Sequence, residues 1–337
     1  MEQSNFFPSR TVKKGSRDEK TVKKDLRDFR HKSSTDLKNA QESTKNIEFW
    51  RELDTIAKEA ITRLYEEKTG IKFGEEAHGT AYILPIDRGA GLVSKEETGG
   101  SVSAVRDAIT IFVPSAGDPE NYKRLVSLFH ERFHFVGRKA VTAKMEKKRG
   151  FFPWVTHTNV TLQDAQLGFI TKGKEIRGEG LEEAITHFYS ENMLRNSTDP
   201  RLLEIRKNAL IDVLQPAAAH PEVISLITTV KSTSLEQFNL IEQRLKTSKE
   251  MFAEREIVSY RLYEVLLARA EKLGLKAEFE KEALIARVMP EKTKQFFDLL
   301  KVVVGDEVQA RKIYTLRTDN LDEMKSFVNQ LSINSSV

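Results

Sequence analysis

The residue types with the most specific chemistry occur together in one short segment, His130-Glu131-Arg132-Phe133-His134. On a helix, two histidines four positions apart lie on one face and one turn apart, so both imidazoles can reach a single metal ion. Glu131 points to a neighbouring side, where it can take a proton from a metal-bound water and deliver it to a leaving amine. The spacing therefore predicts a hydrolytic metal site. For the pentapeptide alone, the alternative is a coincidental pair of histidines on the flank of a structural helix.

A catalytic zinc ion usually has three protein ligands and one open position, so the two histidines need a third partner. The chain contains no cysteine, which excludes a thiolate ligand, an iron–sulfur cluster and a cysteine nucleophile. No histidine follows the motif at a short spacing, so we expect a carboxylate from a later helix. The candidate segment begins with Gly178-Glu179-Gly180 and carries Glu182 and Glu183 on a predicted helix. If Glu183 is the ligand, Glu179, one turn earlier, is the substitute, and Glu182 is expected to project into solvent.

The two segments together resemble the signatures of gluzincin-type zinc metallopeptidases, the group to which thermolysin belongs. They are also similar to uncharacterised bacterial H-E-x-x-H proteins, for which no substrate is implied. In gluzincins, a second helix carries an Asn-Glu-Ala/Gly-hydrophobic-Ser/Thr-acidic segment whose glutamate is the third zinc ligand. Matched to Leu181-Glu-Glu-Ala-Ile-Thr, the resemblance implies that Glu183 is this ligand and that Glu182 takes the Asn place. His187 takes the acidic place, from which a residue supports a ligand histidine; a histidine there could instead contact the metal or the substrate.

The resemblance implies one Zn²⁺ per chain, bound by His130, His134 and Glu183, and a peptidase in which Glu131 is the general base. The expected partner is a peptide or protein substrate. The alternative is a non-catalytic zinc-binding or helical interaction protein with a degenerate peptidase site. That alternative is motivated by Arg132, where the commoner motif has an uncharged residue, and by the histidine in the acidic place.

A peptidase of this type also needs a group that stabilises the oxyanion of the tetrahedral intermediate. His157, Tyr260 and Tyr263 could supply it, and the sequence does not distinguish among the three. Each of them could also have an ordinary structural role. The other histidines, His31, His78 and His220, have no motif around them.

The two motifs need helices to present them. Gly117-Asp118-Pro119 supplies a turn, an N-cap and a first-turn proline, so the first motif helix is expected over about 119–140. Its apolar stripe runs from Tyr122 to Val136, and both histidines fall on the flank of this stripe, where they would border a cleft. The second motif helix is expected over about 181–195.

The rest of the chain predicts an α+β fold rather than alternating βαβ units. The patterns indicate a helix over about 46–70, strands near 81–86 and 108–114, loops and strands over 150–175, and helices from 200 to the end. In gluzincins, a strand placed like 108–114 edges the cleft and can pair with an extended substrate. The resemblance thus implies a zincin-like fold, in which a small antiparallel or mixed sheet packs on the H-E-x-x-H helix and a mainly helical lobe follows.

The length of 337 residues permits one large domain or two ordinary ones. We expect a basic, disordered tail over 1–45, a zincin-like metal-binding domain over 46–197, and a helical lobe over 198–337 that completes the cleft. The tail has 12 Lys and Arg against 7 Asp and Glu, whereas the whole chain has a net charge of +4. Its few apolar residues favour a solvated arm that is mobile or marginally helical, with contact to nucleic acid or an anionic surface as the weaker alternative.

The chain has no apolar run long enough to cross a membrane, and its start lacks the apolar core of a secretory signal. Without a need for disulfides, we expect a cytoplasmic protein with no membrane partner.

Overall fold

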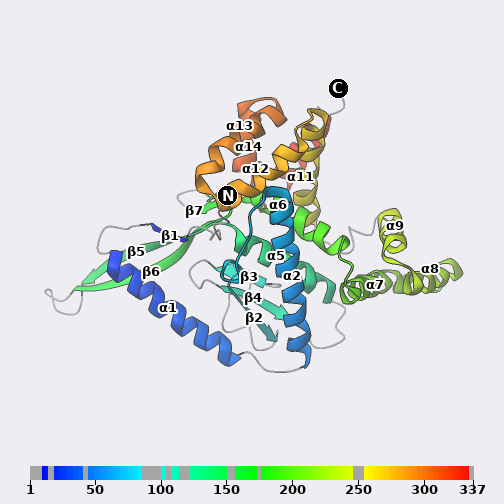
Figure 1. Ribbon diagram of the computed structural model, residues 1–337, viewed down its shortest axis with the longest axis horizontal. Coiled ribbons are helices and arrows are strands. Elements are labelled where there is room, and N and C mark those ends of the chain that lie inside the picture. Colours follow the sequence, from blue (N-terminus) through cyan, green and yellow to red (C-terminus); the bar gives the residue numbers. More distant parts are fainter. Residues whose placement is uncertain are drawn as a thin grey trace.

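Helices and two small sheets surround the segment that carries the first motif (Figure 1). The computed structural model describes residues 10–13, 19–40, 45–85, 100–103, 108–113, 121–149, 156–172, 176–245 and 254–333. The expected turn and N-cap at Gly117-Asp118-Pro119 lie outside these residues. Segregated sheets and helices confirm the α+β class.

A three-stranded mixed sheet lies at the centre of the first half of the chain. Its order is β2-β4-β3, where β2 (Thr80–Pro85) runs parallel and β3 (Gly100–Ser103) antiparallel to β4 (Ala108–Val113). Every residue of β4 is buried, as its β-branched run predicts. Because β4 is hydrogen-bonded on both sides, it is not an edge strand, and the expectation that it pairs with an extended substrate is wrong.

The two faces of this sheet pack on different helices. Side chains alternate between the faces of a strand, and Ile109, Ile111 and Val113 of β4 join a buried cluster with α2 (Lys45–Thr69) and α5 (Asn121–Val136). Tyr82, Leu84 and Phe112, on the opposite face, pack with Leu37 of α1 (Glu19–Ala40). The sheet therefore packs on the motif helix, as expected, and is covered on its other side by a helix from the N-terminal segment.

The helix α1 corrects the expectation of a disordered tail over 1–45. The segment Glu19–Ala40 is helical, and its Leu26 and Leu37 are buried. These two leucines are 11 positions, or three helical turns, apart, so that they lie on one face. The short strand β1 (Arg10–Lys13) also belongs to a sheet. Few apolar residues are enough to hold this helix on the molecule, because Leu37 packs against an apolar face of the sheet.

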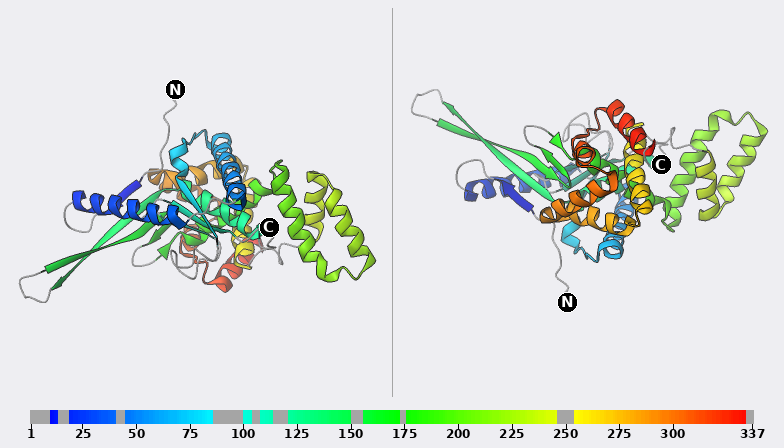
Figure 2. Two further views of the ribbon diagram at one scale, coloured as in Figure 1. Left: turned by 90° about the horizontal axis from the view of Figure 1, so that it is seen from below. Right: turned by 90° about the horizontal axis from the view of Figure 1, so that it is seen from above.

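The motif helix α5 is described from Asn121 and ends at Val136, four residues earlier than expected. The chain leaves the helix at Gly137, where a side chain would come within 3.1 Å of the Gly168 backbone. Strand β5 (Lys139–Arg149) then begins and pairs with β6 (Thr156–Leu167) in a long hairpin that projects from the body (Figure 2). The sequence predicts strands after residue 150 and misses the strand β5.

The hairpin belongs to a second sheet of five strands, in the order β1-β5-β6-β7-β8. The strands β7 (Ile170–Lys172) and β8 (Ile176–Arg177) are short and lead directly into helix α6 (Glu179–Arg195). The predicted second motif helix therefore exists and starts about half a turn earlier than expected.

The described residues after 198 are helical, which confirms the predicted helical third of the chain. The helices α7 (Pro200–Leu214), α8 (Pro221–Ser232) and α9 (Leu235–Leu245) share a small buried cluster and extend to one side of the molecule (Figures 1 and 2). The remaining helices lie over α6; they are α11 (Glu254–Lys272), α12 (Lys276–Val288), α13 (Thr293–Val304), α14 (Glu307–Thr315) and α15 (Leu321–Ile333).

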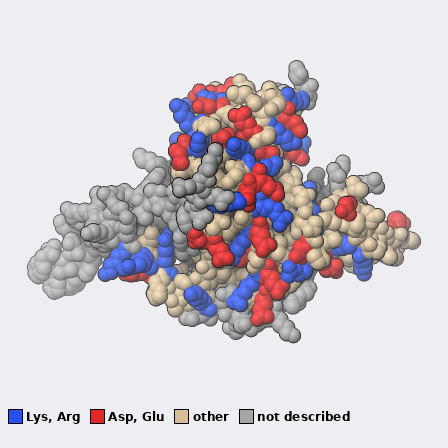
Figure 3. Space-filling model, viewed as in Figure 1, with Lys and Arg blue, Asp and Glu red and all other residues tan. Residues whose placement is uncertain are grey.

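One large buried cluster joins these C-terminal helices to α2, α5 and α6. It includes Tyr65, Phe133, Leu181 and Leu266, so the core passes across the expected boundary between 197 and 198. In the described ranges, none of the helices has the length and apolar character needed to span a membrane. Acidic and basic side chains alternate over the face shown in Figure 3, without a large area of one sign.

Candidate metal centre

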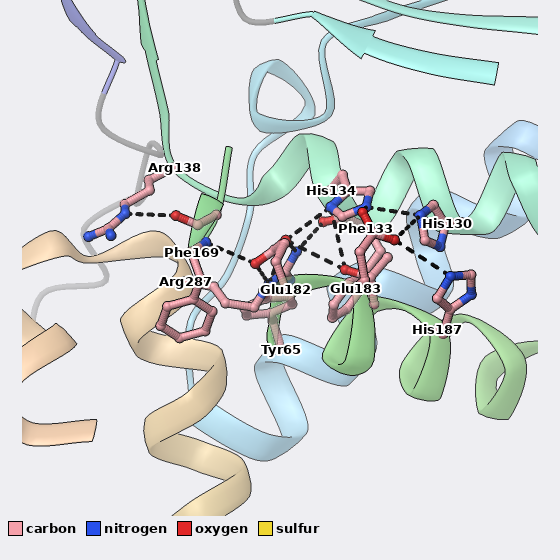
Figure 4. A network of polar contacts seen from close by, with 12 residues as sticks. Tyr65, His130, Phe133, His134, Arg138, Phe169, Glu182, Glu183, His187 and Arg287 are labelled. Carbon is pink, nitrogen blue, oxygen red and sulfur yellow. Dashed lines mark hydrogen bonds and ion pairs between the residues drawn. The ribbon is translucent and has the colours of Figure 1, made fainter. Parts of the chain in front are cut away.

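Two neighbouring helices bring the four candidate side chains together (Figure 4). The helix α5 carries His130 and His134, and α6 carries Glu183 and His187, so each contributes two residues that are four positions apart. Residues at that spacing lie one above the other on a helix face. Because α5 and α6 pack together, the two pairs face each other.

The start of α6 is fixed by glycine. Gly178 has φ 76°, in the left-handed region, and a side chain there would collide with the carbonyl oxygen of Phe169. Its backbone N–H donates to Tyr314 O at 2.7 Å, and the N–H of Gly180 donates to Leu316 O at 3.0 Å. The end of α14 thus holds the first turn of α6 and sets the height at which Glu183 meets α5.

Three of the four side chains have ligand atoms at the spacing that a tetrahedral zinc ion requires. His130 Nε2 lies 2.9 Å from His134 Nε2. The two Nε2 atoms are each 3.2 Å from an oxygen of Glu183, His130 from Oε2 and His134 from Oε1. Ligand atoms about 2.0–2.1 Å from a tetrahedral ion are roughly 3.3 Å from one another. The donor set therefore fits a zinc ion held by His130, His134 and Glu183.

The fourth side chain, His187, lies among the donors rather than behind them. Its Nε2 is 3.5 Å from Glu183 Oε2, and its ring centroid is 4.3 Å from that of His130. His130, Glu183 and His187 offer ligand atoms that all lie within 4.8 Å of one another. Within the described residues, Nδ1 of His130 has no hydrogen-bond partner. The supporting hydrogen bond that the resemblance implies for His187 is therefore not formed with His130.

Glu182 takes the supporting role for the other histidine. Nδ1 of His134 donates to Glu182 Oε1 at 3.0 Å, which leaves Nε2 to face the metal position. Glu182 Oε2 accepts from the backbone N–H of Phe169 at 2.9 Å. The side chain is completely buried, so the expectation that Glu182 projects into solvent is wrong. Its carboxylate orients the His134 imidazole from inside the core.

Arg287 of α12 balances this buried carboxylate. Its Nε donates to both oxygens of Glu182 at 3.1 Å, and its Nη2 also bonds Oε1. The same guanidinium donates to the hydroxyl of Tyr65 at 2.8 Å and to the carbonyl of Phe133 at 3.1 Å, and it lies over the Phe133 ring. Hydrogen bonds from α2, α5 and α6, and from the backbone of Phe169 between β6 and β7, thus surround the buried pair of Glu182 and Arg287.

The charges of the cluster are strongly coupled. Burial by itself raises the pKa of Glu182, but the charge of Arg287 and the hydrogen bond from His134 outweigh it and lower this pKa to about 2. Burial lowers the pKa of His134, but the carboxylates of Glu183 and Glu182 outweigh it and raise this pKa to about 10. The pKa of His187 lies well below its ordinary value because of burial and the nearby His130, which favours the neutral imidazole that metals bind.

The chain matches no protein-family model, no curated protein and no solved structure. The likeness to gluzincins therefore remains a prediction from the two motifs. The chemistry of the site has to be argued from its own donor atoms and their surroundings.

The other two residues of the first motif have different surroundings. Glu131 is half-buried on α5, next to His130 in the sequence. Arg132 is completely buried, and its Nη2 donates to Asp54 Oδ2 of α2 at 2.6 Å. It also bonds the carbonyl oxygen of His78, in the short helix α3 (Glu75–His78). The arginine that departs from the commoner motif thus ties α5 to α2 and α3, on a side away from the donors.

A cavity of about 210 Å³ reaches the cluster at His187. Its lining includes His187, Glu191, Arg195, Tyr260 and, from the motif helix, Val126. Tyr260 is therefore the expected oxyanion candidate that faces a space next to the site. Tyr263 is buried, and its hydroxyl lies 3.4 Å from that of Tyr189.

Of the remaining candidates, those whose side chains the structure describes lie away from the site. The side chain of His157 lies outside the described residues. Glu179, the substitute ligand, lies 3.9 Å from Arg317. His78 is buried and hydrogen-bonded to Thr62, and His220 is exposed at the start of α8.

Proposed function

We propose that this protein is a zinc-dependent peptidase with a zincin-like arrangement of sheet, motif helix, ligand helix and helical lobe. The observation that supports this most directly is the convergence of three donor atoms from His130, His134 and Glu183, at separations of 2.9–3.2 Å. Two helices supply these atoms from sequence segments that resemble the two gluzincin signatures. Their partial exposure, 12% for His130 and 21% for Glu183, leaves one side of the cluster accessible.

In this proposal, a bound zinc ion would act as a Lewis acid that lowers the pKa of water and polarises the scissile carbonyl. Glu131 accepts the proton of the attacking water and delivers it to the leaving amine. The carboxylate of Glu182 keeps the His134 imidazole in one tautomer and orientation. Tyr260, which lines the adjoining cavity, is our candidate for stabilising the oxyanion.

The decisive experiment separates metal binding from hydrolysis. Glu131→Gln should keep about one zinc per chain and lose cleavage of a mixed peptide library, because only the proton acceptor changes. His134→Ala and Glu183→Ala should lose the zinc as well. The matched control is Glu179→Gln, a carboxylate on α6 that lies against Arg317 and should change neither property. Full hydrolysis by Glu131→Gln would exclude the proposed base.

A second function is favoured by one observation, the presence of a fourth side chain, His187, within reach of the donors. Four protein ligands are typical of structural zinc sites. The protein would then be a non-catalytic zinc-binding or helical interaction protein. Wild-type protein that retains one zinc per chain and cleaves no peptide in the library would favour this reading.

A further inference from the structure

The position of His187 is compatible with a site that alternates between three protein ligands, as in catalytic zinc sites, and four, as in structural ones. The two helices present matching pairs, with His130 and His134 on α5 opposite Glu183 and His187 on α6. A metal ion that binds the first three donors lies next to the fourth, because His187 Nε2 is 3.5 Å from Glu183 Oε2. The ligand atoms of His130, Glu183 and His187 all lie within 4.8 Å of one another, close to the roughly 3.3 Å spacing of ligands in a tetrahedral shell.

We propose that His187 is a displaceable fourth ligand, which closes the coordination sphere in the resting protein and leaves it when a substrate or another metal-binding group enters. The inference rests on the metal-binding part of the proposed function. In the resting protein, His187 would occupy the fourth coordination position, which water occupies in an open catalytic site. The four side chains suffice for this, because three imidazoles and one carboxylate fill the four positions of a tetrahedral zinc ion.

The adjoining cavity makes the displacement possible. His187 lines this cavity of about 210 Å³ together with Tyr260 and Glu191, so its ring lies between the donors and a space that a ligand could fill. The other three donors are held differently. His134 is fixed through Glu182, and Glu183 contacts His130 and His134 as well as His187. Of the four, His187 is the donor at the boundary between metal position and cavity.

X-ray absorption at the zinc edge, on the full-length zinc-loaded protein, counts the imidazole ligands directly. We expect three in the wild type and two in His187→Ala. The matched control is His220→Ala, at an exposed histidine on α8, which should keep three. A wild-type count of two would overturn the proposal and leave the peptidase proposal intact. Failure of the wild type to take up zinc would overturn both. The wild-type count does not depend on how well the variant folds.

Displacement is tested with acetohydroxamate, a small bidentate zinc ligand. Saturating the wild type with it should lower the imidazole count from three to two, and His187→Ala should bind it about tenfold more tightly or better, because no histidine has to leave. In the same variant, zinc itself should bind at least about tenfold more weakly. A count that stays at three with hydroxamate bound, or equal hydroxamate affinity in both proteins, would show that His187 does not move.

Discussion

Glu182 and Arg287 show how much of the site depends on residues that contact no metal. The carboxylate touches His134, and the guanidinium touches the carboxylate, Tyr65 and the Phe133 backbone. The pair is completely buried. Removing one partner of such a pair leaves an uncompensated charge in the core, which is usually more damaging than losing both.

Arg287→Met should therefore lower the free energy of unfolding by about 3–5 kcal/mol and weaken zinc binding by roughly 10–100-fold. The double variant Glu182→Gln with Arg287→Met should recover part of the stability and none of the zinc affinity, because Glu182→Gln removes the carboxylate that orients His134. Urea unfolding and zinc titration measure the two effects. Arg317→Met, at a side chain that is 43% exposed, is the matched control and should change both by little. Wild-type zinc affinity in Arg287→Met would contradict this role.

His78 predicts a pH dependence that is independent of the metal donors. Burial, together with the positive charges of Arg132 and Lys58, lowers the pKa of this imidazole to about 4. In the unfolded chain it returns to about 6.5, so below that pH the unfolded state binds more protons and stability falls as the pH drops. The stability is complete above about pH 6.5.

Between pH 7.5 and pH 5, His78 should cost the wild type about 2 kcal/mol of unfolding free energy. His78→Gln should show a correspondingly smaller change in urea unfolding between these two pH values. His220→Gln, at an exposed histidine, is the control and should behave like the wild type. If His78→Gln shows the same pH dependence as the wild type, the change in unfolding free energy arises from titratable groups other than His78.

Single residues also mark what the sequence could and could not predict. The three proposed ligands follow from a spacing within one helix and a second short motif, so they could be predicted from the sequence. Glu182 was misplaced because its partner is 105 positions away. One signal was present: Arg287 stands alone between apolar residues in Leu-Ile-Ala-Arg-Val-Met, and a lone charge in such a run indicates a buried ion pair.

At the scale of elements, the position of α6 depends on the turn at Gly178. Gly178→Ala should destabilise the protein and weaken zinc binding, because the residue has φ 76° and its added methyl group would collide with Phe169 O. Gly274→Ala provides a matched control, since Gly274 has φ 72° but no atom lies within 4 Å of an added Cβ. It should cost about 1 kcal/mol and leave zinc affinity unchanged. Equal zinc affinities in the two variants would show that the turn does not position Glu183.

The helices were easier to predict than the strands. Trp50, Leu53, Ala57 and Ile61 recur at helical spacing, and all are buried in α2. The place of β4 in its sheet was misjudged because an apolar run is compatible with an edge or a central strand, and only the pairing with β2 and β3 decides. The strand β5 was missed because five of its 11 residues are Lys or Arg, which are rare in strands.

At the scale of the whole molecule, the helical C-terminal part contributes to the candidate metal centre. It contributes Arg287, and its helices share one buried cluster with α5 and α6. A chain that ends at residue 197 should therefore lose helical structure and bind no zinc, as measured by circular dichroism and metal content. Deleting residues 1–44 removes α1 but none of these contacts, and should leave one zinc per chain. Stable zinc binding by residues 1–197 would show that the metal site folds without the helical part.

The bond between Arg287 and the Tyr65 hydroxyl joins residues 222 positions apart, and this has a consequence for synthesis. Chains fold progressively as they leave the ribosome, starting from the N-terminus. His130, His134 and Glu183 emerge long before Arg287, and until then the carboxylate that orients His134 has no counter-charge. The nascent chain therefore carries an incomplete centre, which matures only when α12 has been made.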